Sequence, residues 1–561
     1  MKDIRENLRS QLDFFYQWEK ERPEKVFLRQ PFGDEWKTMT YREAGQQARK
    51  IATALQELGL KKGDHIGIFS KNCYHWVLAD LAIMMGGFVS TPFYPNLSTE
   101  QTKVVLEKSD AKLVFAGKLD QWDNINAAIP ADMPIIKFPH YQGNAKVDRG
   151  HEWADLIAQH ELMLGNPLPN ITDTWTILFT SGTTGTPKGV VHTYENAALI
   201  INAELIKDNL KVGQVEENVF FSFLPLNHIA ERTAVEIGAF MSGGSISFAE
   251  SLDTFAKNLQ ETQPTLFFAV PRIWTKFYMA VIAKLPQKRL DTLLKIPIVS
   301  GLIKKRIKTS LGLSNANMIM TGASITPEPL KQWYRSLDIN LREVYGMTEN
   351  FGGFSLMPEH DHKAHTVGRP LPFCEGKTDP DTGEILMNVP WVMKGYYKDP
   401  ELTAAVIKDG WLHTGDRGEF DKDGYLKIIG RVKDAFKTTK GKFVVPTLIE
   451  GRFAESEMIE QICVAGLGIP QPIALVNLSE AAASLPEQEV RAVLSQQLQH
   501  VNQQSSKHEL VSTVVVTKDA WSPDNQLLTP TLKIRRASID DQYMEQYKNW
   551  HESDMKIIWE A

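Results

Sequence analysis

Residues 180–189 read TSGTTGTPKG and combine three glycines, five hydroxyl side chains and one lysine. Glycines allow backbone N–H groups to approach a ligand closely, and hydroxyl and ammonium groups add hydrogen-bond donors. Polyphosphate is the ligand that this combination suits. Apolar segments precede and follow the stretch, at residues 175–179 (WTILF) and 189–192 (GVVH). We therefore predict a phosphate-binding loop between two strands, because a flexible linker, the alternative, would not usually join such segments.

The loop does not follow the P-loop pattern of nucleoside triphosphatases. That pattern requires a glycine before its lysine and a serine or threonine after it. Here Pro187 precedes Lys188 and Gly189 follows it. The sequence therefore argues against a Walker-type kinase or ATPase and indicates a phosphate-binding loop of another design.

The composition indicates an ordinary globular protein. The 561-residue chain is too long for one compact core, and its 43% hydrophobic and 23% charged residues are typical of soluble proteins. A net charge of −6 gives no indication of binding to nucleic acid or to anionic lipid. The three cysteines, Cys73, Cys374 and Cys463, are far apart, form no metal-binding pattern and fit a reducing compartment.

No segment has the pattern of a signal peptide or a membrane span. Residues 1–25 are charged throughout, without the apolar core of a signal peptide. The most apolar stretch, residues 76–90, carries an aspartate and is shorter than the ~20 residues that span a bilayer, so a buried helix is expected. We expect a cytoplasmic protein without a transmembrane segment, for which peripheral membrane contact and oligomerisation are both compatible with the sequence.

The chain is expected to form a large N-terminal and a smaller C-terminal domain. Residues 40–60 repeat apolar residues at helical spacing, residues 61–70 read as a turn and a strand, and residues 98–117 read as a helix and a strand. This alternation favours parallel sheets covered by helices. After about residue 365, short strands between Gly, Asp and Pro turns predict a small antiparallel unit. The polar stretch near Arg431 predicts the boundary, with domains at 1–432 and 433–561.

Five stretches occur in the order found in AMP-forming adenylating enzymes. They are TSGTTGTPKG, YGMTE (345–349), GWLHTGD (410–416), GRVKD (430–434) and LLTPTLKIRR (527–536). From about residue 25 to residue 540 the chain resembles acyl-CoA synthetases of this adenylate-forming superfamily, which includes luciferases and adenylation domains of peptide synthetases. FLPLNHIAER (223–232) and residues 248–274 are similar to the long-chain fatty acyl-CoA synthetase branch. The resemblance implies an α/β fold: a large N-terminal domain of stacked α/β sheets with a small β-barrel-like unit, and a mobile α+β C-terminal cap.

The resemblance also implies a set of nucleotide-binding residues. These are Thr180, Ser181, Gly182, Thr183, Thr184, Gly185, Lys188, Gly322, Ala323, Ser324, Tyr345, Gly346, Met347, Thr348, Asp416 and Arg431. The loop would hold the β- and γ-phosphates of ATP, Tyr345 the adenine and Asp416 the ribose hydroxyls, of which one carboxylate accepts both. Thr180 and Glu349 are the implied Mg²⁺ ligands, and Mg²⁺ prefers such hard oxygen donors. Without the resemblance, Glu349 would read as a solvated glutamate and Asp416 as a turn residue.

The catalytic residues that the resemblance implies are Lys533, His228 and Thr348. Lys533 would bring its charge to the carboxylate and the α-phosphate, and the alternative is one cation in a basic surface run. His228 would lie by the acyl carboxylate and the path of the CoA thiol, and the alternative is a structural histidine. Thr348 would contact the α-phosphate.

Motion of the cap is implied to occur at Lys433, for which the alternative is an ordinary exposed lysine in a polar turn. Lys440 and Gly441 would lie on the CoA side. Their stretch reads KTTKGKFVVP, which departs from the commoner family pattern K-T-S-G-G-E-x-I-x-P. Residues 373–386 are also a short version of a segment that is usually longer.

The activity that the resemblance implies is ATP-dependent ligation of a fatty acid to CoA, with ATP, Mg²⁺ and CoA as cofactors and no nucleic-acid partner. The small residues within 236–244 (EIGAFMSGG) suggest room for an acyl tail, so a medium- or long-chain fatty acid is expected. Two alternatives remain at this point. One is an acyl-AMP ligase that loads a carrier protein, and the other is a nucleotide-binding relative that has lost catalysis.

Overall fold

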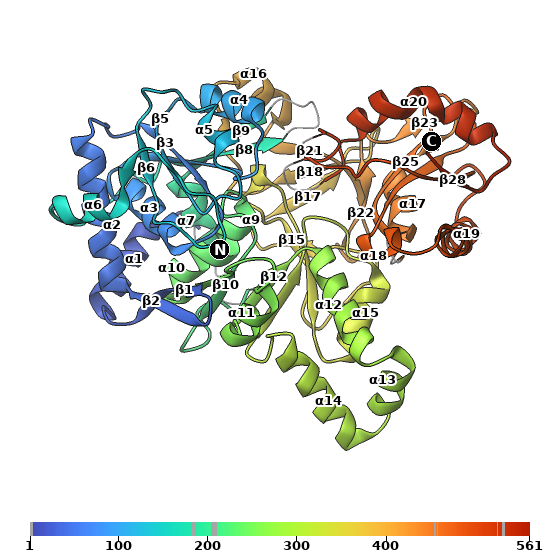
Figure 1. Cartoon of the computed structure of the whole chain (residues 1–561), viewed down its shortest axis with the longest axis horizontal. Coiled ribbons are helices and arrows are strands. Elements are labelled where there is room, and N and C mark those ends of the chain that lie inside the picture. The colour runs from blue at the N-terminus through green and yellow to red at the C-terminus, as the bar shows by residue number, and fades with distance from the viewer. Residues whose placement is uncertain are drawn as a thin grey trace. The chain divides into compact units, whose positions relative to one another are not determined.

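The computed structural model describes residues 4–181, 187–202, 210–453, 456, 458–523, 525–529 and 533–560 (Figure 1). The internal contacts divide the chain into two units. The first consists of the described residues up to 375 together with Asn388–Gly410, and the second of Gly376–Met387 and the described residues from 411 onward.

An eight-stranded sheet in the first unit carries the strands on either side of the predicted phosphate loop. Its order is β19-β9-β8-β4-β3-β5-β6-β7. The strands are β3 (His65–Ser70), β4 (Val89–Phe93), β5 (Ala111–Gly117), β6 (Ile135–Lys137), β7 (His151–Glu152), β8 (Thr174–Ser181), β9 (Pro187–Thr193) and β19 (Gly395–Tyr396). The pairs from β7 through β8 are parallel, whereas β9 pairs antiparallel with both β8 and β19. The predicted parallel architecture is therefore confirmed, with an antiparallel edge where the loop lies.

The second sheet of this unit has nine strands, in the order β16-β15-β14-β13-β12-β10-β11-β1-β2. They are β1 (Val26–Phe32), β2 (Glu35–Thr40), β10 (Val219–Ser222), β11 (Ser245–Phe248), β12 (Leu266–Ala269), β13 (Met318–Thr321), β14 (Leu341–Tyr345), β15 (Ser355–Leu356) and β16 (Arg369–Pro370). The strands from β1 to β14 run parallel, and β2, β15 and β16 add antiparallel pairs at the two edges.

Helices cover these sheets. They are α1 (Gln11–Glu21), α2 (Tyr41–Glu57), α3 (Tyr74–Met85), α4 (Thr99–Ser109), α5 (Asp123–Asn126), α6 (Trp153–Gln159), α7 (Tyr194–Asn202), α9 (Ile229–Glu231), the π-helix η1 (Arg232–Ile237), α10 (Gly238–Ser242), α11 (Phe255–Thr262), α12 (Pro271–Lys284), α13 (Gln287–Leu294), α14 (Pro297–Ser310), α15 (Glu328–Ser336), the 3-10 turn η2 (Thr348–Asn350) and α16 (Pro400–Val406), which the short strand β20 (Ile407–Lys408) follows. Across the described residues, none of the helices combines the length and the apolar character needed to traverse a bilayer.

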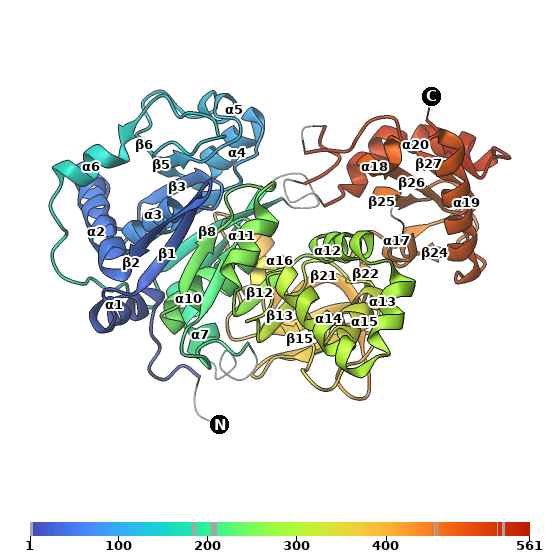
Figure 2. The same ribbon diagram turned by 60° about the horizontal axis from the view of Figure 1, so that its bottom comes forward.

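Helix α3 is the buried helix predicted from residues 76–90, although it ends at Met85 and β4 takes the last residues of that stretch. Every residue of α3 after Tyr74 is buried. The helix packs against β3 and β4 of one sheet and β1 of the other, so it lies between the two sheets (Figure 2).

A buried ionic network joins α3 to the π-helix η1. Arg232 pairs with Asp80 of α3 and, at 2.8 Å, with Glu236, and all three side chains are inaccessible to solvent. Arg232 also donates to the hydroxyl of Thr176 in β8, at 2.9 Å. Removing one partner would leave an uncompensated charge in the interior, so we assign these residues of the 223–232 stretch and its continuation a structural role.

The second unit begins with the predicted small antiparallel sheet, in which β18 pairs with β21 and β21 with β22. Beyond it, four strands form a sheet in the order β25-β26-β27-β28. The elements are β17 (Glu375–Thr378), β18 (Glu384–Asn388), β21 (Trp411–Phe420), β22 (Leu426–Arg431), β23 (Phe436–Lys437), β24 (Phe443–Val444), α17 (Pro446–Phe453), β25 (Ile459–Ala465), β26 (Ile473–Leu478), α18 (Glu480–Ala483), α19 (Glu487–Gln503), β27 (Val514–Val516), α20 (Arg536–Glu552) and β28 (Ile557–Trp559). The mixed α and β character expected after residue 432 is confirmed.

Candidate functional site

The two strands that lead into and out of the predicted phosphate loop form one hairpin. Thr180 of β8 lies opposite Lys188 of β9, and Ser181 lies opposite Pro187. The predicted ligands Gly182, Thr183, Thr184 and Gly185 fall outside the described residues, as does the side chain of Ser181. The structure therefore fixes the base of the loop, where Thr180 and Lys188 are neighbours.

Tyr396 connects this hairpin to the predicted metal ligand. Pairing of β19 with β9 puts the ring of Tyr396 5.5 Å from the ammonium of Lys188. The Tyr396 hydroxyl donates to Oε1 of Glu349, at 2.7 Å. Burial raises the pKa of Tyr396, and the charge of Glu349 raises it further, so the hydroxyl stays protonated and acts as the donor.

Tyr396 could not be singled out from the sequence, since it lies in a GYY stretch outside all of the motifs. Only the long-range pairing of β19 brings it beside Lys188 and Glu349.

The YGMTE stretch forms a tight turn after β14. A Cβ atom on Gly346 would lie 2.2 Å from the carbonyl oxygen of Gly352, so the backbone approach requires glycine. The Met347 N–H donates to the side chain of Asn350 at 2.8 Å, and the Gly352 N–H donates to the Met347 carbonyl at 2.9 Å. Tyr345, at the start of the turn, is half-buried and meets Phe354 edge-on.

Two hydrogen bonds to backbone carbonyl oxygens hold Thr348 and Glu349 in place. Nε2 of His192, in β9, lies 2.8 Å from the Thr348 carbonyl oxygen. Burial lowers the pKa of His192 to about 4, so at neutral pH the ring is uncharged and its Nε2–H is the donor. The Met393 N–H donates to the Glu349 carbonyl at 2.8 Å. Both residues are thus held against the eight-stranded sheet.

Gly322, Ala323 and Ser324 follow β13, which runs parallel to β14. The carboxyl ends of parallel strands meet at one edge of a sheet, so this segment lies beside the turn at Tyr345. A Cβ atom on Gly322 would lie 2.7 Å from the Val344 carbonyl oxygen, and Ala323 adopts a left-handed backbone with φ of 66°. Ala323 and Ser324 are exposed at this edge, where a ligand could contact their backbone.

His228 begins α9, beside the same turn. Its Nδ1 accepts a hydrogen bond from the Ala230 N–H at 3.2 Å, so a neutral ring carries its proton on Nε2. Thr233, in the following π-helix, donates to the Phe351 carbonyl at 3.3 Å. A Cβ atom on Gly352 would lie 3.5 Å from Cγ2 of Ile229, so the FLPLNHIAER stretch lies next to the turn that follows β14.

The premise that small residues at 236–244 leave room for an acyl tail is wrong. A Cβ atom on Gly238 would lie 2.8 Å from the ring of Phe220, and one on Gly243 would lie 2.5 Å from the ring of Trp18. These glycines allow close packing of aromatic side chains. The space beside them is filled.

Three predicted residues come together in the second unit. Asp416 and Arg431 are opposite each other on β21 and β22, with Oδ1 and Nε 2.7 Å apart. Lys533 as a whole residue is exposed, whereas its ammonium group is surrounded by protein atoms, and this desolvation lowers the pKa of the ammonium. The charge of Arg431 lowers this pKa further and that of Asp416 raises it, so Lys533 lies within electrostatic reach of both.

The predicted hinge and CoA-side residues are also in this unit. Lys433 is exposed, and both of its neighbours are tethered: the Val432 N–H donates to the Gly415 carbonyl at 2.9 Å, and Asp434 lies 3.7 Å from Arg536. Lys440 and Gly441 are exposed in the turn between β23 and β24, where Gly441 has a φ of 76°.

No group of three or more His, Cys, Asp or Glu side chains among the described residues is arranged to hold a metal ion.

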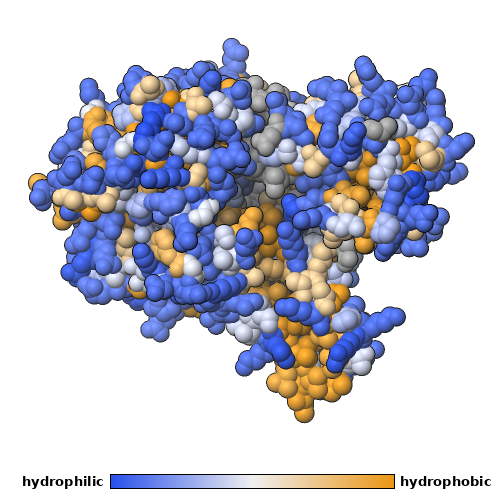
Figure 3. Space-filling model, viewed as in Figure 1, coloured by the Kyte–Doolittle hydropathy of each residue, from blue (hydrophilic) through white to orange (hydrophobic). Residues whose placement is uncertain are grey.

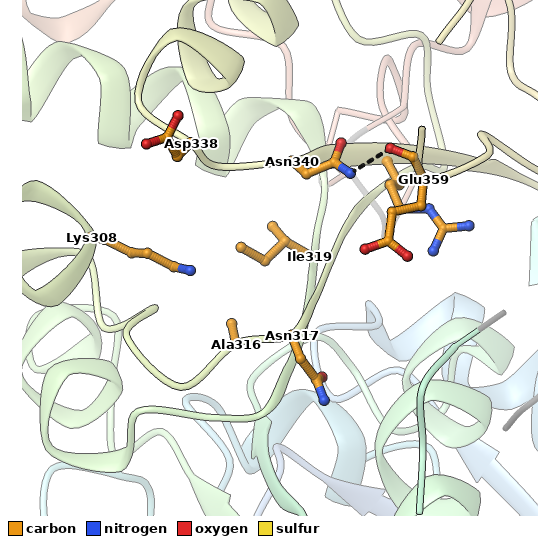
Figure 4. A pocket seen from close by; sticks show the side chains of 8 residues that line it. Lys308, Ala316, Asn317, Ile319, Asp338, Asn340 and Glu359 are labelled. Carbon is orange, nitrogen blue, oxygen red and sulfur yellow. Dashed lines mark hydrogen bonds between the residues drawn. The ribbon is translucent and has the colours of Figure 1, made fainter. Parts of the chain in front are cut away.

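A separate cavity of about 150 Å³ lies at the amino ends of β13 and β14, at the opposite end of these strands from the turn at Tyr345 (Figure 4). Its lining residues are Lys308, Ala316, Asn317, Ile319, Asp338, Asn340, Arg342 and Glu359. Two cations and two carboxylates balance in charge, and no predicted site residue is among them.

Comparison with known proteins gives a consistent result. Residues 15–397 match the AMP-binding enzyme family, and residues 433–553 match the AMP-binding enzyme C-terminal domain. The chain is 28% identical to long-chain-fatty-acid–CoA ligase FadD15 of Mycobacterium bovis, with 94% of each chain covered. It is 26% identical to long chain acyl-CoA synthetase 2 of Arabidopsis thaliana, over 96% of this chain and 92% of the relative.

Solved structures share the fold. The anthranilate CoA ligase AuaEII in complex with anthranoyl-AMP superposes with a TM-score of 0.76 at 20% identity, covering 96% of this chain and 98% of that one. The A domain of the carboxylic acid reductase from Segniliparus rugosus, in complex with AMP and a carboxylic acid, gives a TM-score of 0.80 at 19% identity, covering 97% and 94%.

Proposed function

Since the chain belongs to the AMP-binding enzyme family and is an AMP-forming acyl-CoA synthetase, we propose that it activates a medium- or long-chain fatty acid. The long-chain relatives support the choice of acid, and the contact that carries the ATP-dependent activation is the Tyr396–Glu349 hydrogen bond beside Lys188 and Thr180. It gathers cationic, hydroxyl and carboxylate groups at the base of the phosphate loop, which is the donor set that a nucleotide polyphosphate and its metal require.

The chemistry proceeds in two steps. A carboxylate is a poor acyl donor because oxide is a poor leaving group. The fatty-acid carboxylate therefore attacks the α-phosphorus of ATP, displacing pyrophosphate and forming acyl-AMP. The thiol of CoA then attacks the acyl carbon and displaces AMP, giving the thioester.

In the first unit, we propose that Lys188 and Thr180 hold the pyrophosphate end of ATP, and that Thr348 contacts the α-phosphate. Tyr345 and residues 322–324 take the adenine at the shared strand edge. His228 lies by the acyl carboxylate. Neutral His192 keeps the Thr348 carbonyl turned away from the phosphates, leaving the threonine side chain for them.

Glu349 suits a hard divalent cation. Its Oε1 accepts from Tyr396, which fixes the carboxylate and leaves Oε2 for an ion. When bound, Mg²⁺ neutralises the charge that accumulates on the leaving pyrophosphate.

In the second unit, we propose that Asp416 binds the ribose hydroxyls, with Arg431 holding its carboxylate at 2.7 Å, and that Lys533 stabilises charge on the carboxylate and α-phosphate. We further propose a domain boundary at Lys433, giving domains 1–432 and 433–561, with Lys440 and Gly441 on the CoA side. A cytoplasmic location is part of the same proposal.

Tyr396→Phe is expected to raise the Mg²⁺ concentration for half-maximal rate about tenfold, because a hydrogen bond to a charged group contributes about 1.5–3 kcal/mol. Phenylalanine keeps the ring beside Lys188, so the change isolates the hydroxyl. The measurement is initial rate against Mg²⁺ at saturating ATP. Tyr397→Phe is the matched control, since that hydroxyl donates to Asp110 instead, and it should leave the Mg²⁺ dependence unchanged. An unaltered Mg²⁺ dependence in Tyr396→Phe would exclude this positioning role.

The substrate proposal is tested by a panel of acids. We expect kcat/KM to favour acyl chains of roughly eight carbons or more, since each buried methylene contributes about 0.8 kcal/mol. Dodecanoate, octanoate, acetate and benzoate are compared under identical conditions. A higher kcat/KM for acetate or benzoate than for dodecanoate would show that the substrate is not a long-chain acid.

The departure from the family pattern at Lys440 and Gly441 keeps a second acceptor in consideration, the phosphopantetheine arm of a carrier protein. Free CoA distinguishes the two, because a ligase that loads only a carrier protein forms acyl-AMP but no acyl-CoA. A relative without catalysis would release no pyrophosphate.

A further inference from the structure

Helices α13 and α14 form a hairpin that extends from the nine-stranded sheet of the first unit (Figure 1). Its base is fixed: Leu290 and Ile307 are buried in the core, and Trp333 of α15 donates to Gln287 at 2.9 Å. The base of the hairpin is therefore anchored to the core of the first unit.

The tip, which we define as residues 293–303, presents apolar side chains to solvent. Ile296, Ile298 and Leu302 are 46%, 81% and 65% exposed. Figure 3 shows these apolar residues gathered at the end of the hairpin, over α13 and α14. Scattered exposed leucines are ordinary, whereas a contiguous apolar surface on a protruding element indicates a binding surface.

The tip is surrounded by cations. Residues 284–308 contain eight lysines and arginines against one aspartate, a net charge of +7, so the rest of the chain carries −13. The basic residues are Lys284, Lys288, Arg289, Lys295, Lys304, Lys305, Arg306 and Lys308. Lys304 pairs with Asp338 at 3.0 Å. Lys295, Lys305 and Arg306 are exposed and have no carboxylate within 4 Å in the described parts of the chain.

We propose that this hairpin docks the protein on a membrane that contains anionic lipids. Ile298 and Leu302 enter the boundary between headgroups and acyl chains, and the surrounding cations contact lipid phosphates. Charge complementarity selects this partner. A second copy of the chain is a poorer fit, because it would bring two surfaces of net +7 together.

The overall charge of −6 conceals this surface, which is why the composition gave no indication of lipid binding. An anionic membrane repels the remainder of the chain, at −13, while attracting the hairpin. Binding would therefore have one preferred orientation, with the tip toward the bilayer.

Co-sedimentation with vesicles tests the proposal without any catalytic turnover, so its outcome is independent of the proposed substrate. We expect the wild-type chain to bind 3:1 phosphatidylcholine–phosphatidylglycerol vesicles at least tenfold more tightly than pure phosphatidylcholine. Reversing Lys295, Lys305 and Arg306 to Glu together should weaken this binding at least 100-fold, since each basic residue near an anionic surface contributes about fivefold. Ile298→Asp with Leu302→Asp should weaken it more than tenfold.

Two control variants match these changes elsewhere on the surface. Leu164 and Leu252 are 93% and 90% exposed, and their replacement by Asp should change binding less than twofold. Replacing the three exposed lysines Lys103, Lys422 and Lys507 by Glu should likewise change vesicle binding less than twofold. The midpoint of thermal unfolding should be unchanged in every variant, showing that the folds are intact.

Equal losses in the tip and control variants would overturn the proposal, because net charge alone would then explain binding. Wild-type binding by both tip variants would overturn it as well. So would sedimentation velocity showing a wild-type dimer that Ile298→Asp with Leu302→Asp dissociates, since the tip would then contact a second copy.

Discussion

Lys533→Ala is expected to slow acyl-AMP formation about 10²–10³-fold, the usual cost of removing one electrostatic contact with a developing charge. Lys533 lies within electrostatic reach of Asp416 and Arg431, the residues proposed to hold the ribose end of the nucleotide. In the proposed mechanism Lys533 is needed only while the carboxylate attacks the α-phosphorus. Conversion of supplied acyl-AMP and CoA to the thioester should therefore stay near the wild-type rate.

The two half-reactions are measured separately, as pyrophosphate release and as acyl-CoA formation from synthetic acyl-AMP. Arg535→Ala is the matched control, since it removes a cation from the same basic run. It should affect both half-reactions little. Equal losses of both half-reactions in Lys533→Ala would mean that the lysine has a structural role.

Lys433→Pro is expected to abolish most thioester formation while much of the acyl-AMP formation survives. In the proposed mechanism one site serves both steps, with Lys533 inserted for adenylation and withdrawn for thioester formation. A short segment that absorbs a large change in φ and ψ allows both. Proline fixes φ near −65° and restricts the residue before it. The C-terminal cap would therefore be held in one conformation and could not rotate between the two half-reactions.

Lys433→Ala is the control for Lys433→Pro, since alanine removes the ammonium and leaves the backbone free. Its two half-reactions should both resemble the wild type. The tethers on Val432 and Asp434 flank the proposed hinge on either side, which confines the change to Lys433. Wild-type thioester formation from acyl-AMP by Lys433→Pro would exclude Lys433 as the hinge.

Local sequence patterns predicted the elements that their own residues determine. The helix predicted within residues 40–60 is α2, whose N-terminus is capped reciprocally by Thr40 and Glu43. The strands on either side of the phosphate loop are β8 and β9, and the turn-rich segment after residue 365 supplies an antiparallel sheet. Apolar periodicity and turn residues act over a few positions, so they can be read directly.

Features that depend on distant pairing could not be predicted in this way. Tyr396 reaches Glu349 only because β19 pairs with β9, some 200 residues earlier in the chain. The small residues within 236–244 predict open space, whereas the rings of Phe220 and Trp18 fill the space beside Gly238 and Gly243. The net charge of the whole chain does not reveal the basic tip, because it sums the charges of all residues. In each case the missing information is which distant residues become neighbours.

The product stoichiometry with dodecanoate, ATP and Mg²⁺, measured with and without CoA, tests the proposed two-step ligation. We expect that with CoA one AMP and one pyrophosphate form for each dodecanoyl-CoA. Without CoA, pyrophosphate release should stop after about one equivalent per enzyme, with acyl-AMP bound. Formation of ADP and phosphate, or AMP production without any acyl-CoA when CoA is present, would contradict it.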